Sequence, residues 1–463
     1  MNENKALFDE DFDLDADLDF DATLTRVLEE VDPLDSGAEA PGSDALDSEG
    51  IPASQEGWEV FTDLGDGGAR AIPAIHAVAF CESAATRQMI SNVAADRRMA
   101  HARLDIEEGG LIKAMQYLGL NPTPNLLILE SSAPAASLLG QIDQLATLCE
   151  EGVQVMVIGA TNDISLYRQL MARGVSDYLI APVTPVQLVR SIGELFTDPD
   201  APFVGKSVSV IGAKGGVGAS TLAHNLAWAM SENASVNTSL IDLDLSFGTT
   251  ALDFNHETGQ TVVDALLAPE RADDAVISRL LTKATDRLSL FTAPASLSQI
   301  VDVEPAAYAK VIDGVRRLMP YVVLDLPHGW TSWLSQTLIG SDEVVLVCQP
   351  DLASLRNGKN IIDTLNAKRP NDAPPRLVIN MSGVPKRPEI PMKDFSAAIG
   401  IEPEIILPFD PHLFGTASNN GQMISETDPL AKPSQAIDTL AASLTGRELS
   451  PAKPTLLGRL LGK

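Results

Sequence analysis

The sequence predicts two consecutive α/β domains, each built on a parallel β-sheet. Short, almost uninterrupted apolar runs alternate with helical patterns in residues 70–198 and again in about 203–448. Runs of this kind are typical of strands buried on both faces, as in a parallel sheet covered by helices. The chain is 463 residues long, which is enough for two or more domains.

Composition divides the chain into five segments. A polar stretch with two prolines, residues 197–202, marks a hinge between the two domains. We expect an acidic arm over residues 1–66, a first domain over 67–198, a linker over 199–203, a second domain over 204–448 and a short amphipathic tail over 449–463.

The acidic arm is the most charged segment. Residues 1–50 hold 17 acidic and two basic residues. The net charge of this segment is therefore half of the −30 of the whole chain. Residues 11–21 alternate aspartate with apolar residues, but neighbouring carboxylates repel and no hairpin partner follows. We therefore expect disorder. Two interpretations stay open: a short adhesive segment for a basic partner, and a solvating tail without a specific partner.

The most informative segment is residues 211–221, Ile-Gly-Ala-Lys-Gly-Gly-Val-Gly-Ala-Ser-Thr. A strand-like run over 207–211 precedes it, and a helical pattern that begins at Leu222 follows. A strand, a glycine loop and a helix in this order bind phosphate, because loop N–H groups and the positive end of the helix dipole converge on the anion. An ordinary glycine turn is the alternative interpretation.

This loop departs from the general pattern G-x-x-x-x-G-K-[ST] at two positions. Ala213 stands at the first glycine and Ala219 at the lysine. Another lysine, Lys214, stands just before the glycines. The loop therefore keeps one cation and lacks the one that the general pattern supplies.

Three aspartates end apolar runs that we expect to be strands of the second sheet. Asp242 and Asp244 lie in the run 240–245, and Asp325 ends the run 321–325. Residues two apart on a strand point to the same face. Ligands of parallel α/β sheets bind at the carboxyl ends of the strands, so we expect these acids near the loop. Taken singly, each could instead be a strand-end cap or a turn residue.

The second domain resembles the MinD/ParA family of deviant Walker A ATPases, whose signature lysine stands at the position of Lys214. The resemblance implies ATP and Mg²⁺ as cofactors. It implies an adenine contact by an asparagine after the run 377–379 and a loop at 408–410 that closes over the base. The nucleotide-binding residues so implied are Lys214, Gly215, Gly216, Val217, Gly218, Ala219, Ser220, Thr221, Asn380 and Pro408.

The same resemblance implies two catalytic residues and three metal-binding ones. Lys214 reaches across a nucleotide-sandwich dimer to the partner's phosphates, and Asp244 positions the attacking water. Mg²⁺ is held, directly or through water, by Ser220, Asp242 and Asp325. Phosphoryl transfer depends on positioning and on neutralising charge, so the loss of a lysine at 219 should weaken ATP binding and turnover. We expect at most a weak ATPase, with nucleotide binding coupled to dimerisation.

The first domain resembles a response-regulator receiver domain, with residues 124–130 and 174–182 as its third and fifth strands. Other strands are expected over 77–80 and 153–158. The receiver chemistry is altered at three places: Glu130 replaces the phospho-acceptor aspartate, Phe80-Cys81-Glu82 replaces the acid pair, and Ala181 replaces the switch lysine. We expect a docking or dimerisation module without phosphotransfer; a fixed mimic of the active state at Glu130 is the weaker interpretation.

Together, the acidic arm, the degenerate receiver and the P-loop domain resemble the CpaE/TadZ family of tight-adherence (Flp-type) pilus assembly proteins. Residues 407–414 and 417–424 add to this resemblance. It implies an ATP-binding localisation and assembly factor in the cytoplasm, at the pole or at the periphery of the inner membrane. The implied partners are a second copy on ATP binding, the pilus secretion ATPase and inner-membrane platform proteins.

Several other functions were weighed against this one. A DNA-partition ATPase needs a basic surface, which a net charge of −30 does not favour, so no nucleic-acid partner is expected. A nitrogenase-reductase-like carrier needs cysteine ligands, and Cys348 is the only cysteine in the second domain. The altered receiver acids disfavour a signalling regulator. A MinD/ParA-type positioning ATPase unrelated to pili and a non-hydrolysing nucleotide-binding scaffold stay open.

Membrane and further metal signals are weak. No apolar stretch approaches the ~18–20 residues of a spanning helix, and the N-terminus lacks a signal-peptide core. The tail, residues 455–463, fits a frayed end, a docking peptide or a weak membrane contact equally well. The three cysteines and six histidines show no ligand spacing, so no metal besides Mg²⁺ is expected.

Overall fold

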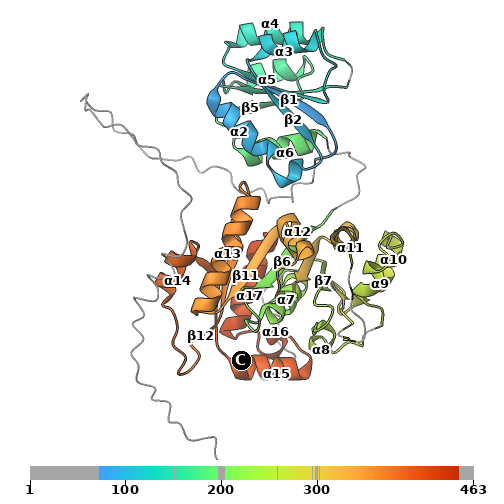
Figure 1. Cartoon of the computed structure of the whole chain (residues 1–463), viewed down its shortest axis with the longest axis vertical. Coiled ribbons are helices and arrows are strands. Elements are labelled where there is room, and N and C mark those ends of the chain that lie inside the picture. Colours follow the sequence, from blue (N-terminus) through green and yellow to red (C-terminus); the bar gives the residue numbers. More distant parts are fainter. Residues whose placement is uncertain are drawn as a thin grey trace, which may run out of the picture. The chain divides into compact units, whose positions relative to one another are not determined.

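The computed structural model describes residues 72–150, 152–196, 204–257, 259–294, 296–297, 301 and 303–447. These residues form two sheets, one built from strands that precede the predicted linker in the sequence and one from strands that follow it (Figure 1). The predicted acidic arm, linker and tail lie outside the described residues, so these segments and the exact domain boundaries stay predictions. No helix in the described part of the chain is both long enough and apolar enough to cross a bilayer.

The first sheet has five strands, all paired in parallel, in the order β2-β1-β3-β4-β5. Its strands are β1 (His76–Cys81), β2 (Arg103–Glu108), β3 (Leu126–Ser131), β4 (Gln154–Gly159) and β5 (Asp177–Ile180). The helical segments are α2 (Ala84–Ala94), η1 (Arg97–Met99), α3 (Leu111–Leu118), α4 (Ala135–Ala146), α5 (Ile164–Met171) and α6 (Pro185–Leu195). This strand order is that of flavodoxin-type folds, so the predicted receiver-like sheet is confirmed.

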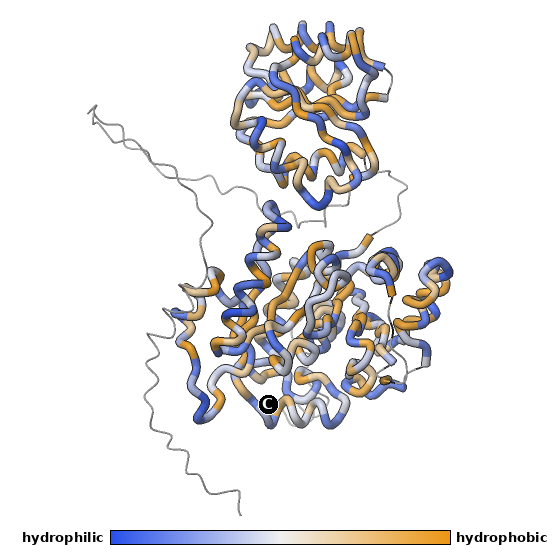
Figure 2. Tube along the Cα trace, viewed as in Figure 1, coloured by the Kyte–Doolittle hydropathy of each residue, from blue (hydrophilic) through white to orange (hydrophobic). Residues whose placement is uncertain are grey.

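Alternation along the strands of this sheet builds two cores. Val78 and Phe80 face the layer of α3, α4 and α5, whereas Ala77 and Ala79 face the layer of α2 and α6. Successive side chains of a strand point to opposite faces, so a strand covered on both sides must be apolar throughout. Figure 2 shows this as orange segments concentrated in the strands of the sheet.

Strand β2 was not expected from the sequence. It reads Arg-Leu-Asp-Ile-Glu-Glu, and it pairs with β1 alone at the edge of the sheet. An edge strand has one unpaired side, which tolerates charged residues. The apolar signal that identified the central strands is therefore diluted here.

The altered receiver site is closed by hydrogen bonds to Glu130. One of its carboxylate oxygens accepts from the backbone N–H groups of Glu82 (2.7 Å) and Ser83 (2.8 Å). The other accepts from the hydroxyls of Ser83 and Thr86, both at 2.7 Å. Burial alone would raise the pKa of Glu130, but these hydrogen bonds outweigh it and lower that pKa below the ordinary 4.5.

A second glutamate, Glu82, makes the reciprocal contact with the loop after β3. The Glu82 carboxylate accepts from the backbone N–H of Ser132 (2.9 Å) and from its hydroxyl (2.7 Å). Glu130 thus holds the loop after β1, while Glu82 holds the loop after β3. Both carboxylates are therefore engaged within the protein, and the expected lack of phosphotransfer stays a prediction.

The second sheet has eight strands in the order β13-β12-β11-β6-β10-β7-β9-β8, and only the pairing of β8 with β9 is antiparallel. Its strands are β6 (Lys206–Gly212), β7 (Thr238–Asp242), β8 (Thr282–Lys283), β9 (Leu288–Phe291), β10 (Tyr321–Asp325), β11 (Glu343–Cys348), β12 (Arg376–Ser382) and β13 (Pro403–Pro408). The predicted parallel α/β fold is confirmed. Strands β8 and β9 were not expected.

The helices of this domain fall into two layers. One layer holds α9 (Val262–Leu266), α10 (Asp274–Leu280), α11 (Pro305–Leu318), α12 (Ser332–Gly340), α13 (Leu352–Lys368) and α14 (Met392–Ile399). The other holds α7 (Ala219–Trp228), α15 (Pro411–Asn420), α16 (Ile424–Thr427) and α17 (Lys432–Thr445). The short α8 (Thr250–Asp253) and the π-helical turn η2 (Ala229–Asn233) complete the set.

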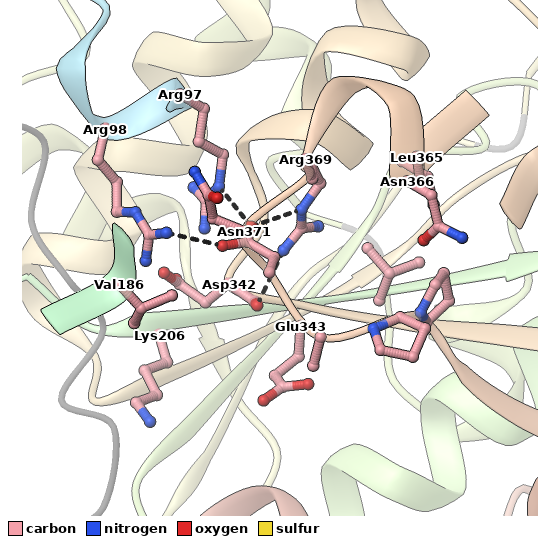
Figure 3. Close-up of a pocket in the computed structure, with 15 residues that line it drawn as sticks. Arg97, Arg98, Val186, Lys206, Asp342, Glu343, Leu365, Asn366, Arg369 and Asn371 are labelled. Carbon is pink, nitrogen blue, oxygen red and sulfur yellow. Dashed lines mark hydrogen bonds and ion pairs between the residues drawn. The ribbon is translucent and has the colours of Figure 1, made fainter. Parts of the chain in front are cut away.

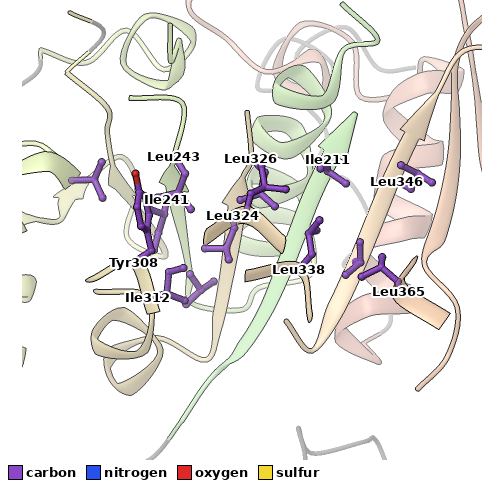
Figure 4. Packing of buried hydrophobic residues seen from close by; sticks show 14 of the residues in the cluster. Ile211, Ile241, Leu243, Tyr308, Ile312, Leu324, Leu326, Leu338, Leu346 and Leu365 are labelled. Atoms are coloured by element: carbon purple, nitrogen blue, oxygen red, sulfur yellow. The ribbon is translucent and has the colours of Figure 1, made fainter. Parts of the chain in front are cut away.

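Figure 4 shows the core beneath the first of these layers. Strand residues such as Ile211 and Leu324 pack against helix residues such as Ile312 and Leu338, and all four are almost completely buried. Burial of side chains of this size stabilises by about 1.5–3 kcal/mol each. This packing fixes the central strands, and so it fixes the positions of the loops at their carboxyl ends.

We predict that Glu130→Gln loosens the first domain at the start of α2. The glutamine would present an N–H₂ group where the carboxylate now accepts from backbone N–H groups, at a cost of about 1–3 kcal/mol. Because folding lowers the pKa of Glu130, its contribution is present above pH 4.5 and is lost as the pH falls through the lowered value.

Hydrogen exchange at pH 7 over residues 81–90 should therefore become faster in Glu130→Gln. The exposed Glu150→Gln is the matched control and should exchange like the wild type. If hydrogen exchange in Glu130→Gln is as slow as in the wild type, the hydrogen bonds of Glu130 contribute no stability.

Candidate functional site

The candidate site lies at the carboxyl end of the central strand β6. The strand ends at Gly212, and α7 begins at Ala219. Between them the backbone reverses through left-handed conformations at Gly216 (φ +76°) and Gly218 (φ +86°). A Cβ at Gly218 would come within 2.4 Å of the Asn380 amide nitrogen, so only glycine fits there.

Three amide side chains hold the carbonyl groups of this loop. Asn357 donates to the Ala213 carbonyl (3.0 Å), Gln349 to the Gly216 carbonyl (3.3 Å) and Asn380 to the Val217 carbonyl (2.8 Å). These donors come from β11, β12 and α13 or the segments beside them. With its carbonyl groups tied to the protein, the loop suits a site in which N–H groups face an anion.

The signature lysine is paired within its own chain. Lys214 Nζ lies 2.7 Å from Asp351 Oδ2, while Asp351 Oδ1 accepts from the Ser354 N–H and caps α13. Burial alone would raise the pKa of Asp351, but hydrogen bonds from Lys214 and Ser354 outweigh it and lower that pKa. About a third of the Lys214 side chain is exposed, so exchange of this partner for another anion carries a modest cost.

Two buried carboxylates lie beside each other next to the loop. Asp242 and Asp325 end the neighbouring parallel strands β7 and β10 and are paired in register. Their exposed fractions are 0% and 1%. Burial, followed by the charge of Asp325, raises the pKa of Asp242 to about 6. The predicted convergence of these two acids at one edge of the sheet is therefore present in the structure.

Asp244 lies outside the strand, because β7 ends at Asp242. Its N–H donates to Asp242 Oδ1 (3.1 Å), and its own Oδ1 accepts from the Phe247 N–H (3.0 Å). The strand alternation expected over 240–245 thus does not extend to Asp244. The residue is only partly buried, at the start of a turn that wraps Asp242.

A buried histidine that the sequence analysis did not select completes the cluster. His224 lies on α7 with no exposed surface. Its Nδ1 is 2.8 Å from Asp253 Oδ2, and its Nε2 is 3.3 Å from Asp325 Oδ2 and 3.0 Å from the Thr250 hydroxyl. Burial alone would lower the pKa of His224, but the two carboxylates outweigh it and raise that pKa to about 10.

In the sequence, His224 is not part of any metal-ligand spacing. Only its position among apolar helix residues could have indicated that it is buried and paired. It stands in a helix whose neighbouring residues, Leu222, Ala223, Leu226 and Ala227, are apolar and buried. Titratable side chains at such positions are seldom fully buried unless they are paired. Its partners are 29 and 101 residues away in the sequence, so no short motif reveals them.

The acids suit a divalent cation. Ligand atoms of His224, Asp242 and Asp325 all lie within 4.8 Å of one another. Within the described residues, neither oxygen of the buried Asp325 carboxylate accepts a hydrogen bond, although Oδ2 lies 3.3 Å from His224 Nε2. Carboxylate oxygens are the ligands that Mg²⁺ prefers. Ser220 is in the first turn of α7. The predicted metal role of Ser220, Asp242 and Asp325 stays a prediction that this donor set fits.

The predicted base-binding residues lie at the neighbouring edge of the sheet. Asn380 is on β12, and Pro408 ends β13 opposite Ser382. The Phe409 N–H donates to the Ser382 carbonyl (2.8 Å), which continues this contact into the 408–410 loop. The Asn380 amide nitrogen donates to the Val217 carbonyl, and its amide oxygen accepts from the Met381 N–H (2.8 Å). Its predicted contact with adenine would therefore require a rearrangement of the side chain.

A cavity lies alongside the loop, about 350 Å³ in volume. It is lined by the first loop residues, by the segment after β10 and by one side of α13, including Ala213, His328, Trp330, Asn357 and Asn360. About half of the Trp330 surface is exposed. This cavity lies at the carboxyl end of the sheet, where parallel α/β folds bind their ligands.

Another cavity, shown in Figure 3, is less suited to a nucleotide. Its second-domain lining includes Lys206 and Glu343, which begin β6 and β11, so it lies at the amino ends of the strands. Arg369 there donates to the carbonyls of Leu338 (3.0 Å) and Asp342 (3.3 Å). The guanidinium is therefore engaged by the protein itself.

The chain is similar to several known proteins. A family model described as an AAA domain matches residues 205–373. The pilus assembly protein CpaE from Caulobacter crescentus CB15 is 45% identical; the match covers 28% of this chain and 98% of that structure, with a TM-score of 0.27.

Two septum site-determining proteins are also similar. MinD of Helicobacter pylori is 25% identical over 256 residues, which is 52% of this chain and 91% of that protein. A MinD structure from Pyrococcus horikoshii in complex with Mg-ADP is 18% identical, over 52% of this chain and 96% of that one, with a TM-score of 0.45.

We predict that Gly218→Ala destabilises the second domain, whereas Gly215→Ala does not. Alanine at 218 would require a positive φ and would displace the Asn380 amide, at a cost of about 1–3 kcal/mol. At Gly215 the nearest atom to an added Cβ is 3.9 Å away, so that variant is the matched control.

Tryptophan fluorescence in urea measures this difference, because Trp228, Trp330 and Trp333 all lie in the second domain. Equal free energies of unfolding for the two alanine variants would contradict the described geometry of the loop.

Proposed function

Since the chain belongs to the CpaE family of pilus assembly proteins, we propose that it is an ATP-binding localisation and assembly factor for a tight-adherence (Flp-type) pilus machine. The observation that carries the nucleotide part is the loop at the end of β6, with its carbonyl groups tied back by three amides and two buried carboxylates beside it. This arrangement suits a triphosphate with a divalent cation.

Different residues of the site would bind different parts of the nucleotide. N–H groups of residues 215–221 would bind the phosphates at the positive end of α7. Ser220, Asp242 and Asp325 would hold Mg²⁺, which supplies charge neutralisation at the β- and γ-phosphates when it is bound. Asp244, at the start of its turn, would orient the attacking water, and Asn380 and Pro408 would border the base.

Slow ATP hydrolysis would follow from the positions of the lysines in the loop. Ala219 stands where the general pattern has a lysine that contacts the β- and γ-phosphates, so that contact is missing. Lys214 is held by Asp351 in the single chain. If a partner subunit presents its nucleotide phosphates to Lys214, the Lys214 ammonium would leave the Asp351 carboxylate and pair with the more highly charged phosphates. Nucleotide binding and dimerisation would then be coupled, and turnover would depend on both.

A non-hydrolysing nucleotide-binding scaffold is the second candidate. The specific observation in its favour is Ala219, because loss of a single cationic contact to a transferring phosphoryl group can cost several orders of magnitude in rate. This scaffold would still bind ATP and dimerise, so single-turnover hydrolysis separates it from a slow ATPase.

The cellular part of the proposal rests on the family. We propose that the protein acts in the cytoplasm, at a pole or at the periphery of the inner membrane, and recruits the pilus secretion ATPase and platform proteins. The receiver-like domain, whose altered site is closed by Glu82 and Glu130, would serve as a docking module rather than a phosphorylation switch.

We predict that Lys214→Ala still binds ATP but no longer forms an ATP-dependent dimer. The substitution removes the cation that would cross the interface and leaves the loop amides in place. Mass photometry with ATP and Mg²⁺ should show a dimer for the wild type and a monomer for Lys214→Ala.

The exposed Lys393→Ala is the matched control and should dimerise like the wild type. A Lys214→Ala variant that dimerises normally would refute the coupling. A wild-type chain that binds no adenine nucleotide would refute the proposed function altogether.

A further inference from the structure

Two of the amide side chains that hold the glycine loop are connected by the guanidinium of Arg387. Gln349 donates to the Gly216 carbonyl, and its amide oxygen accepts from Arg387 Nη1 at 3.4 Å. Arg387 Nη2 donates to the carbonyl of Met381, the residue after Asn380. A single side chain from the segment after β12 therefore contacts Gln349 directly and reaches Asn380 through the neighbouring backbone.

The backbone beside Asn380 has an unusual conformation. Met381 has a positive φ of 53°, in a region that residues with a side chain seldom adopt. The pairing of β12 with β13 shifts register between Ile379 and Ser382, which marks a bulge at Asn380 and Met381. A bulge re-aims side chains, and here the Asn380 amide reaches the Val217 carbonyl at 2.8 Å. Such a conformation persists only where the surrounding contacts hold it.

Arg387 supplies contacts that hold this bulge. Besides the Met381 carbonyl, its guanidinium binds Glu389 Oε1 at 2.8 Å. The Glu389 carboxylate also accepts from the Gly383 N–H at 2.9 Å, so it closes the turn from which Arg387 projects. The sulfur of Met381 lies 3.0 Å from the amide nitrogen of Gln349. Arg387, Met381 and Gln349 thus form a closed ring of contacts beside the glycine loop.

A glycine-rich loop does not fix the direction of its own peptide groups. Gly215, Gly216 and Gly218 have no side chain, and glycine adopts left-handed and right-handed conformations about equally easily. A peptide group that turned its carbonyl toward a phosphate would repel the phosphate, whereas an N–H group attracts it. Contacts that hold the carbonyl groups away therefore prepare the loop for an anion, and such preparation raises affinity.

We propose that Arg387 is a positioning residue for the phosphate loop. It holds Gln349 and the bulge at Met381, and through them it keeps the carbonyl groups of Gly216 and Val217 turned away from a bound triphosphate. This inference rests on the proposed nucleotide site and deepens it. A guanidinium suits this role because its planar fork donates to several acceptors at once, whereas a lysine ammonium is a point charge.

Calorimetry of ATP binding to the full-length chain, with Mg²⁺, tests this role. We expect Arg387→Ala and Arg387→Lys each to bind ATP about tenfold more weakly or worse, because hydrogen bonds from a charged group contribute at least that factor. The lysine variant keeps the positive charge, but its ammonium cannot hold the Gln349 oxygen and the Met381 carbonyl in the same way. Comparison of the two variants therefore separates positioning from charge.

A double-mutant cycle shows whether Arg387 acts through Gln349. Gln349→Ala alone should also weaken ATP binding, because it releases the Gly216 carbonyl. If the two side chains act in one series of contacts, Arg387→Ala should lower affinity by a smaller factor in the Gln349→Ala background than in the wild type. Lys386→Ala is the matched control: it removes an exposed positive charge next to Arg387 and should leave ATP affinity unchanged.

Three results would overturn the inference while the proposed function stands. If Arg387→Lys or Arg387→Ala binds ATP as tightly as the wild type, the contacts of the guanidinium do not position the loop. If the losses multiply in the double variant, Arg387 acts independently of Gln349. If both Arg387 variants lose their thermal unfolding transition, Arg387 is needed for the fold instead. A wild-type chain that binds no ATP refutes the proposed function itself, and this inference with it.

Discussion

Two carboxylates, Asp242 and Asp325, lie in register at the ends of neighbouring strands with almost no contact with water. Their mutual repulsion, added to the cost of burial, dominates the electrostatics of the second domain, and burial and Asp325 together raise the pKa of Asp242 to about 6. Such a pair is stabilised by a shared proton or by positive charge beside it, whether from a side chain, a metal ion or both. The placement of every cation around the loop therefore bears on what the site can bind.

The basic side chains of this region are paired with acids. Lys214 pairs with Asp351, His224 pairs with Asp253 and Asp325, and residue 219 is an alanine. A carboxylate-paired lysine can be transferred to a stronger anion when one is presented. Under the proposed function, the nucleotide state would control association more than it drives turnover. The first domain, in which Glu82 and Glu130 are hydrogen-bonded within the protein, would act as a docking module.

The sequence predicted those parts of the molecule that depend on local patterns. Central strands such as β6 and β10 were evident because burial on both faces requires continuous apolar runs. Edge strand β2 was missed because its open side admits charged residues. The loop and its acids were evident from spacing, but Asp351, the partner of Lys214, lies 137 residues away. His224 was missed for the same reason, since its meaning depends on acids that only the folded sheet brings to it.

A crystal structure of the full-length chain with a non-hydrolysable ATP analogue and Mg²⁺ tests the central claim most directly. The account predicts a two-fold dimer with the triphosphate on the amides of residues 215–221 and with Lys214 released from Asp351 to the phosphates of the partner subunit. His224 should still lie between Asp253 and Asp325. A monomer in which Lys214 stays on Asp351, or a nucleotide bound away from the end of β6, would contradict it.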